Sequence, residues 1–324
     1  CSAAATGGNL RILKWARANG FPWEDSTCSG AAGSGHLDIL QWARSEGCPW
    51  GSETCWKAAA GGHLGILQWA HANGCPWEDT TCSEAAGSGR LDILRWARSE
   101  QCPWDDRTCS QAAAGGHLGV LKWAHANGCD LGYGVCADAA ARGHLEVLQW
   151  ARANGAGWQP FAITSAAEGG HLELIKWARA HGCPWDSDAC YGATANGHLE
   201  TLKWLVAHGC DWCAHADTLA AQGGHVHILE WMKANNYIHD SAGLTVPTCS
   251  RAAAGGHLGV VQWARANGCP WDSATCCEAA RWGHLQILKW ARRNGCPWSV
   301  AVCTYAAKGG NLEMLKWARR NGCP

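Results

Sequence analysis

Residues 82–108 read CSEAAGSGRLDILRWARSEQCPWDDRT, and close variants of this 27-residue stretch recur along the chain. Its Gly-Arg-Leu centre appears elsewhere mostly as Gly-His-Leu, and eight such centres between His36 and His225 follow one another at intervals of 27 residues. One step of 32 residues, from His225 to His257, marks a five-residue insertion within residues 237–247. A fixed period of this length is the signature of a repeat architecture. We therefore predict a single array over residues 1–324, with twelve copies that start at residues 1, 28, 55, 82, 109, 136, 163, 190, 217, 249, 276 and 303.

Each copy predicts two antiparallel α-helices and leaves no room for a strand. The first helix is expected to begin at a threonine cap such as Thr81, with Glu84 three residues later completing a capping box. Thr275 and Glu278 repeat this arrangement, and small residues after two alanines end the helix. The second helix is expected to begin at Gly-His-Leu and to end at Asn-Gly or Glu-Gly, before a Cys-Pro-Trp linker.

A single copy is too small to bury its own apolar surface, because ordering 27 residues costs about 40 kcal/mol of conformational entropy. Neighbouring copies must cover it, so the fold class is all-α, an α-solenoid of stacked helix-turn-helix repeats. We expect the tryptophan of each second helix to form the structural core, and the linker tryptophan that nine copies carry to pack with it. The second-helix residues are Trp15, Trp42, Trp69, Trp96, Trp123, Trp150, Trp177, Trp204, Trp231, Trp263, Trp290 and Trp317.

The recurring frame Thr-x-x-x-Ala-Ala-x-x-Gly-His-Leu-x-x-Leu-Lys-Trp resembles the ankyrin repeat, Thr-Pro-Leu-His-x-Ala-Ala-x-x-Gly-His-Leu-Glu-Val-Val-Lys-Leu-Leu. The resemblance covers essentially the whole chain. Two departures stand out: the copies are shorter than the 33 residues usual in that family, so its β-hairpin finger is expected to be missing, and cysteine replaces the leucine at the start of the first helix. The resemblance implies a non-enzymatic scaffold that binds a protein along the concave surface of its first helices.

Charge and hydropathy argue against two classes of partner. The chain has 26 Lys and Arg against 27 Asp and Glu, a formal net charge of −1, whereas a nucleic-acid-binding face needs a basic surplus. It has no run of eighteen apolar residues that could span a membrane. No secretory leader is evident, although the chain begins at Cys1. The expected partner is therefore another protein or further copies of this chain.

Most of the 21 cysteines occupy two phases, one in the first helix and one in the linker, and two disulfide patterns fit them. The first joins cysteines seven residues apart across a linker, and the second joins cysteines within a copy, such as Cys28 with Cys48. The spacing does not choose between the patterns, because each has a copy in which both partners are lost together. The pairs of the first pattern are Cys48–Cys55, Cys75–Cys82, Cys102–Cys109, Cys129–Cys136, Cys183–Cys190, Cys269–Cys276 and Cys296–Cys303.

The redox state of these cysteines bears on the location of the protein. The odd count and the absence of an evident leader favour reduced thiols and an intracellular, cytoplasmic protein. Paired cysteines would instead indicate an extracellular one. Cys210 and Cys213, flanked by His208 and His215, have the spacing of half a zinc site, but no second pair accompanies them. We predict no metal site and no cofactor.

We predict that the chain is not an enzyme, because its potential nucleophiles and bases recur in every copy instead of meeting at one unique place. Residues that vary between copies point to partners instead. The positions after the first-helix cysteine are expected to face outward, and aromatic or charged residues there resemble an interface hot spot. The candidate partner-binding residues are Trp56, Lys57, Glu84, Gln111, Asp138, Tyr191, Arg251, Glu278, Trp282 and Tyr305.

A second hypothesis is a structural array that stacks head to tail into a fibre. The first copy keeps the apolar residues Leu10 and Trp15, and the last keeps Leu312, Leu315 and Trp317. A soluble solenoid is expected to end in polar capping copies, so the chain is expected either to join its own copies end to end or to be a segment of a longer array.

Overall fold

The computed structural model describes residues 1–24, 26–212, 215–237 and 246–323, and every regular secondary-structure element among these residues is an α-helix. Most of the insertion predicted within residues 237–247 lies outside the described residues. The helices of the first six copies are α1 (Ser2–Thr6), α2 (Leu10–Ala18), α3 (Ser26–Gly33), α4 (Leu37–Ser45), α5 (Ser52–Gly61), α6 (Leu64–Ala72), α7 (Asp79–Gly87), α8 (Leu91–Ser99), α9 (Asp106–Ala114), α10 (Leu118–Ala126), α11 (Val135–Ala141) and α12 (Leu145–Ala153). The helices of the last six are α13 (Ala162–Glu168), α14 (Leu172–Ala180), α15 (Ser187–Ala195), α16 (Leu199–Ala207), α17 (Ala216–Gly223), α18 (Val226–Ala234), α19 (Val246–Gly255), α20 (Leu258–Ala266), α21 (Ser273–Arg281), α22 (Leu285–Arg293), α23 (Val300–Lys308) and α24 (Leu312–Arg320).

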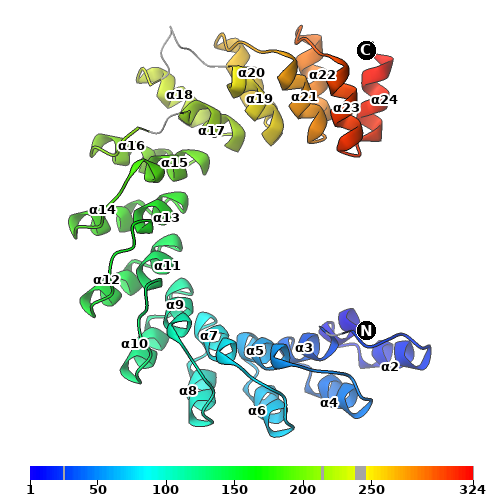
Figure 1. Ribbon diagram of the computed structural model, residues 1–324, viewed down its shortest axis with the longest axis vertical. Helices are drawn as coiled ribbons and strands as arrows, with labels where there is room; N and C mark the ends of the chain where they lie inside the picture. Colours follow the sequence, from blue (N-terminus) through cyan, green and yellow to red (C-terminus); the bar gives the residue numbers. More distant parts are fainter. Residues whose placement is uncertain (25, 213–214, 238–245, 324) are drawn as a thin grey trace. The chain divides into compact units, whose positions relative to one another are not determined.

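The helices form two compact units. Unit 1 comprises Cys1–Ala162 and Trp177–Cys183, and unit 2 comprises Ile163–Lys176 and Pro184–Pro324. Within each unit, odd-numbered helices are the first helices of the copies and even-numbered helices are the second (Figure 1). In unit 1, α7 packs between α5 and α9, and in unit 2, α19 packs between α17 and α21. Each unit is thus a stack of helix pairs, which confirms the predicted α-solenoid.

The first helices lie closer to one another than the second helices do, because their facing residues are small. In α7, for example, Cys82, Ala85 and Ala86 are fully buried. The second helices pack mainly against the first helix of their own copy. The row of first helices is therefore the more tightly packed side of each stack.

The buried core of each copy is aliphatic. In α8, Ile93 and Leu94 are fully buried against the alanines and cysteine of α7, whereas Trp96 is only half-buried. This corrects the assignment of the second-helix tryptophans to the core. Eleven of them are half-buried and Trp15 is 62% exposed. The physical reason is that the tryptophan lies at the edge of the helix face whose centre is occupied by the Ile-Leu pair.

The tryptophans form an aromatic row along the edge of each unit instead. The ring of Trp69 meets that of Trp50, from the linker before it, nearly edge-on with 5.7 Å between centroids. Above Trp50 lies the guanidinium of Arg44, 4.1 Å from the ring centroid, and its Nη1 donates a hydrogen bond of 2.5 Å to the Cys48 carbonyl. In another copy His71 takes the arginine position and stacks on Trp77. Where the linker carries a tryptophan, contacts of this kind join it to the following copy.

The predicted threonine caps are wrong, because an acceptor earlier in the chain starts the helix. Asp272 caps α21 and its side chain accepts from the Ala274 amide at 2.8 Å, which places Thr275 inside the first turn. Likewise α7 starts at Asp79, two residues before Thr81. The hydroxyls of Thr81 and Thr275 are buried without a hydrogen-bond partner among the described atoms. The second helices begin as predicted, with leucine or valine following the Gly-His pair or its Asn and Arg variants.

The histidine of Gly-His-Leu connects consecutive copies. The His144 Nε2 donates to the Ala114 carbonyl of the preceding copy at 3.1 Å, and His284 makes the equivalent contact with Ala254 at 3.1 Å. Each ring lies against a glycine of the preceding copy that has a positive φ. At Gly116, with φ +74°, a Cβ atom would stand 2.6 Å from the His144 ring. The imidazole therefore fills the space that the missing side chain leaves.

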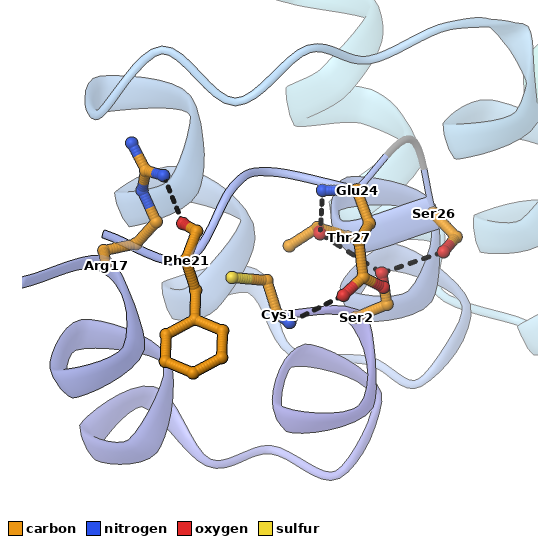
Figure 2. A network of polar contacts seen from close by, with 7 residues as sticks. All are labelled: Cys1, Ser2, Arg17, Phe21, Glu24, Ser26 and Thr27. Atoms are coloured by element: carbon orange, nitrogen blue, oxygen red, sulfur yellow. Dashed lines mark hydrogen bonds and ion pairs between the residues drawn. The ribbon is translucent and has the colours of Figure 1, made fainter. Parts of the chain in front are cut away.

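Polar side chains connect the start of α1 to the segment that leads into α3 (Figure 2). The Ser26 hydroxyl donates to Ser2 Oγ at 2.8 Å, and Ser2 Oγ lies 3.2 Å from Thr27 Oγ1. The Cys1 ammonium is 2.9 Å from Glu24 Oε1, and hydrogen bonds from Ser2 and this ammonium lower the pKa of the Glu24 carboxyl. None of the helices formed by the described residues has both the length and the apolar character needed to cross a membrane.

Candidate partner-binding surface

Residues of the candidate surface lie on first helices in both units. In unit 1, Trp56 and Lys57 lie on α5, Glu84 on α7, Gln111 on α9 and Asp138 on α11. In unit 2, Tyr191 lies on α15, Arg251 on α19, Glu278 on α21, Trp282 directly after α21 and Tyr305 on α23. The exposed members are Gln111, Tyr191, Arg251 and Trp282, and the others are half-buried.

In unit 1 the candidates are largely engaged by their neighbours. The Lys57 ammonium lies 2.9 Å from Glu53 Oε1 and donates to Ser29 Oγ at 3.3 Å. It also lies 5.5 Å from the ring of Trp56. Burial raises the pKa of the Asp138 carboxyl, while a hydrogen bond with Ser110 opposes that shift. These side chains hold adjacent first helices together and offer little free charge.

In unit 2 the structure brings three candidates together. Arg251, Glu278 and Trp282 line one groove of about 650 Å³ over α19 and α21, together with Ser250 and Arg281. The Trp282 indole Nε1 donates to Glu278 Oε2 at 3.2 Å, which fixes the ring beside the groove. The ring itself is 61% exposed.

Some charged side chains of this groove form an ion pair with a neighbour and one does not. Arg281 Nη1 lies 3.4 Å from Glu278 Oε1, and its guanidinium stacks 4.4 Å from the centroid of the Tyr305 ring. The single carboxylate of the groove is thus already paired. Arg251 is exposed and forms no ion pair with any residue that the structure describes. The groove therefore presents one unpaired positive charge next to an exposed indole.

A metal centre receives no support from the described part of the chain. There, no group of three or more His, Cys, Asp or Glu side chains is placed to hold a metal ion. The one zinc-like spacing in the sequence includes Cys213, which lies outside the described residues.

Comparisons with known proteins assign no family to this chain. No protein-family model matches the sequence, and no curated protein matches it. Among solved structures, the human ASB11 ankyrin repeat domain is similar to this chain, with 20% sequence identity and a TM-score of 0.39. That match covers 47% of this chain and 82% of the other.

Within each unit the helix-turn-helix pattern repeats with the predicted order: a short first helix, a turn with a positive-φ glycine, and a second helix that starts at the Gly-His-Leu phase. The chain is built of repeated helix-turn-helix units. Among the described residues of these repeats there is no strand, and so no β-hairpin finger.

The sequence-based choice of residues missed Arg281, which links two consecutive repeats. It pairs with Glu278, three residues earlier on α21, and stacks on Tyr305 of the next repeat. The only signal for it was its separation of three residues from Glu278, a distance that brings two side chains together on a helix. That signal does not distinguish a groove residue from an ordinary surface ion pair.

Proposed function

We propose that this protein is a non-catalytic interaction scaffold and that the first-helix face of unit 2 binds an extended segment of another protein. The observation that carries the proposal is the groove over α19 and α21, where three residues chosen from the sequence lie together. Arginine and tryptophan are the residue types that most often dominate the binding energy of protein interfaces.

The charges in the groove define the chemistry of the partner segment. Glu278 is already paired with Arg281, so a basic partner would have to compete for its carboxylate. Arg251 is exposed beside the exposed ring of Trp282. The segment that fits best carries a carboxylate to pair with Arg251 and an apolar side chain to cover the indole.

Peptides selected from a random library against the immobilised chain should therefore carry an acidic residue close to an apolar one. For such a peptide we expect Arg251→Glu to raise Kd at least about tenfold, because a hydrogen bond to a charged group contributes about 1.5–3 kcal/mol. Trp282→Ala should raise Kd by a similar factor. Fluorescence anisotropy of the labelled peptide measures both changes.

Two variants outside the groove serve as matched controls. Arg293→Glu makes the same charge change at an exposed position of α22, and Trp15→Ala removes a ring that is 62% exposed, close to the 61% of Trp282. Neither should change Kd. If both groove variants bind the peptide as tightly as the parent chain, or the controls weaken it equally, the proposed surface is wrong.

The alternative proposal is a structural array that associates end to end. It is supported by exposed apolar side chains at Ile12 and Trp15 on α2 and at Leu312 on α24, whose exposed fractions are 56%, 62% and 59%. On this proposal the molar mass from light scattering should rise steadily with concentration, and the double variant Ile12→Glu with Leu312→Glu should abolish the rise. A constant mass of 34.5 kDa at every concentration would exclude it.

A further inference from the structure

The helix pairs bring together thiols of the same copy. The Sγ atoms of Cys249 and Cys269 lie 3.1 Å apart, although 20 residues separate the two cysteines. Both side chains are fully buried. In the seven other copies that carry both cysteines, a hydrogen bond between thiols with this separation contributes to the pKa shift of one of the two. The pairs are Cys28–Cys48, Cys55–Cys75, Cys82–Cys102, Cys109–Cys129, Cys190–Cys210, Cys249–Cys269, Cys276–Cys296 and Cys303–Cys323.

This geometry favours the disulfide pattern within a copy over the pattern with a separation of seven residues. A side-chain hydrogen bond joins Cys48 to Cys28 of the same copy. The reason is that the linker folds back over the start of its own first helix. The pattern within a copy, which the spacing left open, is the one that this arrangement allows.

The hydrogen bond within a pair shifts the pKa values of its two thiols in opposite directions. Cys249 and Cys269 pack with Ala264 in one cluster, which the half-buried rings of Trp263 and Trp271 cover. The hydrogen bond from its partner Cys75, together with burial, raises the pKa of Cys55. Burial raises the pKa of Cys136, which has no cysteine in the partner position, to about 11. The hydrogen bond from the partner thiol lowers the pKa of one cysteine in five of the pairs, namely Cys28, Cys75, Cys129, Cys210 and Cys269. The thiolate, which is the reactive form, is thus favoured at one sulfur of these pairs.

We propose that the eight thiol pairs are sites of oxidative modification, at which a peroxide converts each pair to a disulfide within its copy. The Sγ atoms need to approach by only about 1 Å to reach bonding distance. One thiolate attacks hydrogen peroxide, the O–O bond breaks, and a sulfenic acid and hydroxide form. The partner sulfur then attacks the sulfenic sulfur and expels water. In sum, two thiols and one H₂O₂ give one disulfide and two waters.

The modification ties the first helix of a copy to the linker that follows its second helix. The disulfide closes a covalent loop within the copy, and this loop restricts the conformations of the unfolded chain. We expect the thermal midpoint of the fully oxidised chain to rise by roughly 10 °C or more. Removing the peroxide and adding a dithiol reductant should reverse the shift.

The sequence contains internal controls for this pairing. Cys1, Cys136 and Cys183 face Phe21, Ala156 and Ile163 at their partner positions, and Cys213 and Cys277 lie outside the pattern. The proposed pattern therefore assigns no disulfide to these five cysteines. Of 21 cysteines, 21 − 16 = 5 should remain reactive with an alkylating agent after denaturation, whereas the seven pairs of the other pattern would leave 21 − 14 = 7.

Thiol counting and peptide mapping on the full chain test the proposal. The reduced chain is treated with increasing hydrogen peroxide, denatured, alkylated and analysed by mass spectrometry. We expect the alkylated count to fall from 21 to a plateau of five, with cross-linked peptides joining cysteines that are 20 residues apart. A plateau of seven with cross-links seven residues apart would overturn the proposal, and so would conversion to sulfinic acids without cross-links.

Cys269→Ala provides a matched variant, because alanine stands naturally at the equivalent position Ala156. With 20 cysteines and seven pairs, its plateau should be 20 − 14 = 6, and Cys249 should be the additional alkylated residue. Circular dichroism verifies that the variant is helical. Should Cys249 become cross-linked elsewhere as efficiently as before, the assigned pairing is wrong. Cys277→Ser, in contrast, should leave all eight cross-links in place and lower the plateau to four.

Discussion

Replacing Ile93 by alanine will lower the local free energy of unfolding of its repeat by about 3 kcal/mol, within the range of about 2–5 kcal/mol measured for such truncations. Ile93 is fully buried at the centre of the apolar face of α8, next to the equally buried Leu94. Truncation removes its contacts and leaves a cavity that tightly packed neighbours cannot fill. Native-state hydrogen exchange of the α7 and α8 amides should show a roughly hundredfold loss of protection.

Ile12 is the matched control, because it occupies the same position of the repeat and is 56% exposed. Ile12→Ala makes the same chemical change without opening a buried cavity, so its cost should stay below about 1 kcal/mol. Equal losses of protection at the two sites would show that burial of the Ile-Leu pair does not carry the stability of the repeat. Since repeat proteins can unfold in parts, exchange is measured helix by helix.

The same contrast explains which parts of the fold the sequence could predict. The period and the start of the second helix are local and recur in every copy, so one stretch such as residues 82–108 was enough for both. The depth to which a side chain is buried depends on the neighbouring copies and not on the local sequence alone. Helical spacing places Trp96 and Ile93 on one side of α8, but the distance of the neighbouring copy decides that the isoleucine is buried and the indole lies at the edge.

Errors at the caps and the cysteines have a related cause. Thr275 and Glu278 match a capping box, but Asp272, three residues before Thr275, caps the helix with its carboxylate instead. For the cysteines, both disulfide patterns have the period of the repeat, so repetition cannot distinguish them. Only the direction in which the linker folds back distinguishes the two disulfide patterns. In the candidate surface, the outward phase of Arg251 and Trp282 was predictable, while their meeting in one groove depends on how α19 and α21 pack.

A second large effect is expected where a glycine of one copy meets the histidine of the next. Gly116→Ala should lower the free energy of unfolding by roughly 2–4 kcal/mol, for two reasons. Its φ of +74° is unfavourable for alanine by about 1–2 kcal/mol. In addition, the new methyl group would stand 2.6 Å from the ring of His144, which its hydrogen bond to the Ala114 carbonyl holds in place. Urea denaturation followed by circular dichroism measures the loss.

Gly74 separates the two causes, because it has nearly the same φ, +77°, and no neighbouring atom within 4 Å of the added Cβ. Gly74→Ala should therefore show the backbone strain alone, about 1–2 kcal/mol. In the double variant Gly116→Ala with His144→Ala, the ring with which the new methyl group would clash is absent. The loss of unfolding free energy in the double variant should therefore be smaller than the sum of the losses in the two single variants by at least about 1 kcal/mol. If Gly116→Ala costs no more than Gly74→Ala and the cycle is additive, the imidazole does not hold consecutive copies together. A coupling of the expected sign would instead identify the Gly-His contact, repeated from copy to copy, as a direct link between neighbouring helix pairs.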